Sequence, residues 1–104
     1  MKFNKEEFIV KHSQKVFNLL KDFLYSENKE IFEDLRTFMM NENLKSFLYE
    51  GNKYIIQKSL DNSILAIDQI AEENGVSQEQ TRFVLNLMEF LDILTETKEI
   101  VSIE

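Results

Sequence analysis

The sequence predicts a mainly α protein of four to six helices that ends in a small C-terminal β-hairpin, with an all-α helical bundle as the alternative. Three observations favour this fold class. The 104-residue chain contains no Pro and only two Gly, whereas all-β folds use both residues in their turns. Apolar residues recur at helical spacing along most of the chain. A hydrophobic content of 43% with nine Phe suffices for the core of one domain, residues 1–104.

The first two predicted helices are amphipathic. Asn4 and Glu7 have the spacing of a capping box, which places the start of a helix over about 4–25. A second helix begins after Ser26 or Asn28, either of which can cap it. Its expected buried face consists of Ile31, Phe32, Leu35, Phe38 and Met39.

Each of the two glycines is predicted to end a helix in the left-handed conformation. Gly51 would end a short helix that begins at Asn41 or Asn43. Gly75 would end a helix over 67–74. The apolar residues of the short helix are Leu44, Phe47 and Leu48.

The segment 52–74 admits two interpretations. Its apolar residues fit one continuous helical stripe, but the polar cluster at 61–63 favours a break in the backbone. We favour the break, which gives a helix over 52–60, a short extended piece over 63–65 and the helix over 67–74.

The last part of the chain predicts one more helix and then a hairpin. Ser77 with Gln80 forms a second capping-box pattern, and the helix that it opens continues to about residue 91–94. In the tail, 93–103, β-branched residues flank a polar centre, which is typical of a small β-hairpin. A frayed helical tail is the alternative.

The string from Ile67 to Asn86 resembles the helix-turn-helix of winged DNA-binding regulators. Ala71 is small where the two helices would cross, Gly75 allows the turn and Ser77 caps the second helix. The resemblance covers residues 64–103, about two-fifths of the chain. It implies that residues 61–104 form a winged helix-turn-helix, with the C-terminal hairpin as the wing.

This resemblance implies a sequence-specific DNA-binding protein, either a transcriptional regulator or a plasmid or phage partition or replication factor. The second helix would enter the major groove of double-stranded DNA. The residues expected to contact DNA are Ser77, Gln78, Glu79, Arg82, Phe83 and Asn86, with Lys98 on the wing. Gln78 and Asn86 suit adenine edges, and Arg82 suits guanine. The resemblance also implies a homodimer, with the N-terminal helices of residues 1–60 as the interface.

The distribution of charge favours a different partner. Residues 1–60 carry ten Lys and Arg against nine Asp and Glu, but residues 61–104 carry two against ten, a net charge of −8. A negative field repels phosphates. The alternative function is therefore an acidic helical protein-interaction module, such as an immunity, inhibitor or DNA-mimic protein, that does not bind DNA.

No catalytic, cofactor or metal site is predicted. The chain has no Cys and only His12, and it contains no nucleotide-binding or nucleophile motif. Acidic residues interrupt the N-terminal stretch where a signal peptide needs an apolar run, and no window reaches the ~20 apolar residues of a membrane span. We therefore expect a cytoplasmic, non-enzymatic protein without membrane association.

Overall fold

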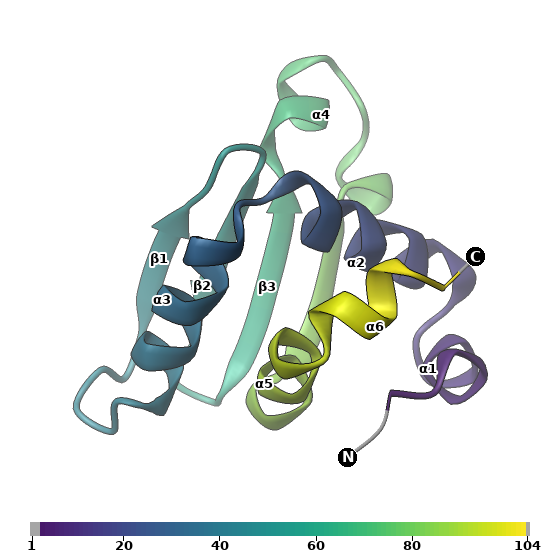
Figure 1. Ribbon diagram of the computed structural model, residues 1–104. Coiled ribbons are helices and arrows are strands. Elements are labelled where there is room, and N and C mark those ends of the chain that lie inside the picture. The colour runs from purple at the N-terminus through teal and green to yellow at the C-terminus, as the bar shows by residue number, and fades with distance from the viewer. Residues whose placement is uncertain (1–2, 104) are drawn as a thin grey trace.

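A computed structural model describes residues 3–103 and shows an antiparallel sheet with helices packed on one of its faces (Figure 1). The helices within these residues are α1 (Lys5–Lys11), α2 (Gln14–Ser26), α3 (Lys29–Met40), α4 (Gln69–Glu73), α5 (Leu87–Thr95) and α6 (Thr97–Val101), with a 3₁₀ turn, η1 (Gln78–Gln80). The strands are β1 (Phe47–Glu50), β2 (Tyr54–Lys58), β3 (Ser63–Asp68) and β4 (Arg82–Asn86), in spatial order β1-β2-β3-β4.

The predicted fold class is wrong in both of its forms. The sheet is larger than a wing hairpin, lies in the middle of the chain and excludes an all-α bundle. The expected helices before Gly51 and over 52–60 are instead β1 and β2. Side chains four residues apart share a face in a strand as well as in a helix, so the helical stripe through this segment did not distinguish the two. The extended piece predicted at 63–65 is confirmed as part of β3.

The N-terminal helix predicted over 4–25 is two helices, α1 and α2. Asn4 caps α1 as predicted, because its side chain accepts a hydrogen bond from the Glu7 backbone N–H at 3.0 Å. Ser13 then breaks the helix with a φ of 151°, and its hydroxyl oxygen accepts from the Val16 N–H to cap α2. The next helix, α3, begins after Asn28, one of the two predicted positions, but the Asn28 side chain makes no capping hydrogen bond.

The helix-turn-helix is absent from this part of the chain, since only the first of its two helices forms. That helix, α4, is followed by Gly75 with a left-handed φ of 90°, as predicted. The expected recognition helix from Ser77 onward is the turn η1 and then β4. In β4 Phe83 and Leu85 face the core while Val84 is exposed, so the apolar residues follow a period of two.

The prediction of a C-terminal wing hairpin is also wrong, because residues 93–103 contain the end of α5 and all of α6. Ile93, Leu94 and Ile100 are buried, and α6 packs against α2. The β-branched residues of the tail therefore form a buried helical face, which is closer to the alternative of a helical tail.

The core lies between the helices and the inner face of the sheet. Phe23 of α2 is at its centre and is 1% exposed. Its ring lies 5.7 Å from that of Phe32, 5.4 Å from that of Tyr54 and 5.9 Å from that of Phe90, with mostly tilted or edge-on geometry. One aromatic cluster thus joins α2, α3, β2 and α5. No helix within residues 3–103 has the length and apolarity required to cross a membrane.

Candidate functional site

The outer face of the sheet carries two rows of four side chains that cross all four strands. Pairing between neighbouring strands defines each row, because directly paired residues point to the same side. The first row, from β1 to β4, is Glu50, Ile55, Ile67 and Arg82. The second row is Leu48, Gln57, Leu65 and Val84.

This outer face is apolar and open. Five of the eight side chains are aliphatic, and Leu48 and Val84 at its two edges are 62% and 56% exposed. Ile55, Leu65 and Ile67 are half-buried between their neighbours on the strands. An antiparallel sheet with one solvated face normally carries polar residues there. A contiguous aliphatic patch on such a face is typical of an interaction surface.

The two charged residues of the outer face stand at opposite ends of one row. The Glu50 side chain makes no hydrogen bond or ion pair with any other residue of the described range 3–103. Arg82 donates from Nε to Glu72 at 2.8 Å and from Nη2 at 3.0 Å. The Arg82 side chain is 33% exposed, and this pairing leaves its Nη1 group free to donate further.

Glu72 is held by two donors at the end of the sheet. Besides Arg82, the Thr81 hydroxyl donates to it at 2.6 Å. The Arg82 hydrogen bond, aided by that of Thr81, lowers the pKa of Glu72 from 4.5 to about 2. The same pair raises the pKa of Arg82. Glu72 therefore fixes the orientation of Arg82 on the outer face.

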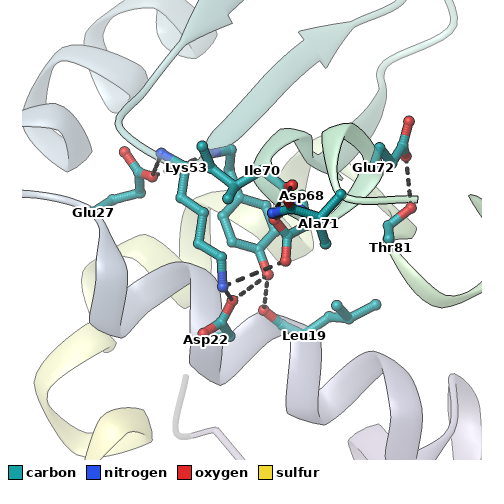
Figure 2. A network of polar contacts seen from close by, with 11 residues as sticks. Leu19, Asp22, Glu27, Lys53, Asp68, Ile70, Ala71, Glu72 and Thr81 are labelled. Atoms are coloured by element: carbon teal, nitrogen blue, oxygen red, sulfur yellow. Dashed lines mark hydrogen bonds and ion pairs between the residues drawn. The ribbon is translucent and has the colours of Figure 1, made fainter. Parts of the chain in front are cut away.

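A second polar cluster lies at the same end of the molecule and joins α2 to the turn between β1 and β2 (Figure 2). The Glu27 carboxylate, in a residue that is 6% exposed, accepts backbone N–H groups of Asn52 and Lys53, each at 2.7 Å. The Tyr54 N–H donates to it at 3.1 Å. Glu27 thus satisfies three backbone donors of the turn and holds the turn against the C-terminal end of α2.

Lys53 lies between two carboxylates in this cluster. Its Nζ is 2.6 Å from Asp22 and 3.4 Å from Asp68. Figure 2 shows Lys53 reaching toward both carboxylates. The Tyr54 hydroxyl donates to Asp22 at 2.7 Å. The hydrogen bond to Asp22 raises the pKa of Lys53, and burial followed by that same carboxylate raises the pKa of Tyr54.

These shifts argue against acid–base chemistry in the cluster. Each one stabilises the protonation form that the group already has at neutral pH, whereas a general acid or base needs a pKa close to the working pH. Within the described residues, no group of three His, Asp or Glu is placed to hold a metal ion. The cluster connects α2, the β1–β2 turn and the start of α4, so its role is to position the sheet.

The residues predicted to contact DNA do not form one surface. Phe83 is buried in the core at 3% exposure. Asn86 caps α5, where its side chain accepts from the Glu89 N–H at 2.8 Å. Lys98 is on α6, on the helical side of the sheet.

The other predicted residues lie near η1. Ser77 precedes the turn, and its side chain makes no capping hydrogen bond. Gln78 and Glu79 are exposed within it. Arg82 is the one predicted residue that lies in the two rows of the outer face.

A signal for the outer face is present in the sequence. Runs such as Tyr54–Lys58 and Ser63–Asp68 have aliphatic residues at both even and odd positions. In a strand this pattern makes both faces apolar. The helical interpretation instead used only Ile56, Ile64 and Ile67 from these runs, as part of one stripe.

The fold and this surface define an α+β protein with a four-stranded meander whose helices cover one face and leave the other open. Searches against protein families, curated proteins and solved structures found no match.

Proposed function

We propose that this chain is a non-enzymatic protein-interaction module that binds another protein chain through the outer face of its sheet. The observation that carries this function is the patch of five aliphatic side chains that no element of residues 3–103 covers. At about 25 cal/mol for each Å² of apolar surface removed from water, covering such a patch favours association. The polar cluster at the end of the sheet ties the β1–β2 turn to α2, and a surface that is ordered before binding lowers the entropic cost of association.

Photo-crosslinking in living cells tests this function and does not require the partner to be identified first. The photoreactive amino acid p-benzoylphenylalanine replaces Val84 on the outer face. In a matched control it replaces Val10, an 89% exposed valine on α1. We expect protein adducts from position 84 and few from position 10. Equal adducts from both positions, or none from position 84, would overturn the proposal.

Sequence-specific DNA binding stays a prediction. The elements on which it depended are a 3₁₀ turn and a strand, and its residues point in several directions. A gel shift at low salt with double-stranded DNA tests it, with Arg82→Ala as the variant. A shift that Arg82→Ala weakens would favour DNA binding over protein binding, because Arg82 would then contribute to holding DNA.

A further inference from the structure

We propose that the partner seated on the outer face is a second copy of this chain, related by a two-fold axis that runs parallel to the strands. This inference rests on the proposed function, because it names the occupant of the same surface. The order of side chains in the two rows favours this occupant.

The first row is complementary to itself when it is reversed. It reads Glu50, Ile55, Ile67 and Arg82 from β1 to β4. Rotation about an axis parallel to the strands places β1 of one copy opposite β4 of the other and keeps each row at its height. Glu50 then faces Arg82 of the second copy at both ends, and the isoleucines face each other in the middle. Such an isologous interface forms every contact twice.

The second row is compatible with the same arrangement. Leu48 faces Val84 of the second copy, so the two most exposed aliphatic residues of the face cover each other. Gln57 faces Leu65 of the second copy, and its amide lies near the centre of the row. Two sheets pack about 10 Å apart with their side chains interdigitated, which this spacing of aliphatic groups permits.

The other two-fold arrangement is disfavoured by charge. An axis across the strands places β1 opposite β1 and exchanges the heights of the two rows. Glu50 then faces Leu48 of the second copy and Arg82 faces Val84. Each charged group is thus covered by an aliphatic side chain and gains no partner across the interface, which costs free energy. In the parallel-axis arrangement Glu50 gains a partner, and Arg82 uses its free Nη1 donors while Glu72 holds its other side.

The size of the interface predicts weak association. Eight side chains a copy are fewer than the roughly 20–30 residues a side of a standard interface. We therefore expect a dissociation constant in the micromolar range, so that monomer and dimer exchange.

Sedimentation equilibrium of the purified chain tests the second copy as the occupant. We expect Glu50→Lys, which places an ammonium opposite Arg82 of the second copy, to weaken the dimer at least tenfold. Glu30→Lys makes the same charge change at an exposed position of α3, on the helical side, and we expect it to dimerise like the wild type. A wild type that remains monomeric at millimolar concentration overturns this inference. That result would not overturn the proposed function, which the photo-crosslinking experiment tests separately. Adducts with a different protein would still support it.

Cross-linking decides the orientation of the two copies. The chain has no Cys, so Leu48→Cys and Val84→Cys each add a single exposed thiol. Circular dichroism can check that each variant still folds. Within one copy these positions are three strand spacings apart, about 14 Å at about 4.8 Å each. We expect a short bismaleimide to join Leu48→Cys to Val84→Cys chains in a mixture far more than either variant to itself. Efficient coupling of Leu48→Cys chains to each other would contradict the parallel axis.

Discussion

The Glu27 carboxylate occupies the space that a side chain at Gly51 would need. A Cβ built on Gly51 lies 2.8 Å from the Glu27 Cδ and closer still to Oε1, and it is 3.1 Å from the Tyr54 carbonyl oxygen. Three backbone hydrogen bonds hold the carboxylate, so it cannot move aside freely. A glycine is therefore required at position 51 because a side chain there would clash with Glu27. The sequence predicted a left-handed φ for Gly51, and this prediction is wrong.

Replacing these two residues should give coupled losses of stability. We expect Gly51→Ala to cost about 2 kcal/mol of unfolding free energy through overpacking. We expect Glu27→Ala to cost about 2–3 kcal/mol, because three backbone N–H groups, including that of the buried Tyr54, lose their acceptor. In the Glu27→Ala background, Gly51→Ala should cost less than half of its single-variant value. Urea unfolding of the four proteins measures this cycle, and additive losses would contradict the packing described.

The Tyr54 hydroxyl should contribute to stability through Asp22. Tyr54→Phe removes this donor but leaves Asp22 with Lys53, so we expect a loss of about 1–2 kcal/mol. Tyr25→Phe is the matched control, because Tyr25 is 84% exposed. Urea unfolding that shows equal losses for the two variants would mean that the buried hydroxyl adds nothing.

The stability conferred by Glu72 should depend on pH. Its pKa in the folded protein is about 2, below the usual 4.5. The ionised carboxylate therefore stabilises the fold above about pH 4.5, and this contribution is lost as the pH falls from 4.5 through 2. We expect Glu72→Gln to lower the Tm at pH 7, and the difference from wild type to shrink below pH 4.5. A difference that stays constant from pH 7 to pH 3 would contradict the ion pair.

The neighbouring Glu73 supplies the control for that titration. It is exposed on α4, and its side chain makes no hydrogen bond or ion pair with other residues in the range 3–103. Glu73→Gln makes the same change in net charge, so it should leave the Tm close to that of the wild type at every pH.

The helices of the first half could be predicted, because their signals are local. Asn4 and Asn28 mark helix starts that the structure confirms, and Gly75 supplies the left-handed turn. The break at Ser13 was missed, because the apolar stripe continues across it from α1 into α2. Capping and turn chemistry depend on a few neighbouring residues, which a sequence displays directly.

The sheet could not be predicted in the same way, because strand pairing depends on residues far apart in the chain. The sequence of Ser77–Asn86 has the pattern of a capped helix, with a serine, a glutamine and spaced aliphatic residues. In the structure the second half of this segment is β4, which pairs with β3. Packing on the sheet overrode the local helical preference. The outer face depends on that pairing, since its rows combine residues from all four strands.

Methyl NMR with a soluble nitroxide provides the test of whether a second copy covers the outer face. In dilute protein the nitroxide should broaden the methyl signals of Leu48, Val84 and Val10, which are all exposed in the monomer. At high concentration we predict that Leu48 and Val84 become protected while Val10 remains broadened. Equal broadening of all three residues at every concentration would show that no second copy covers the sheet.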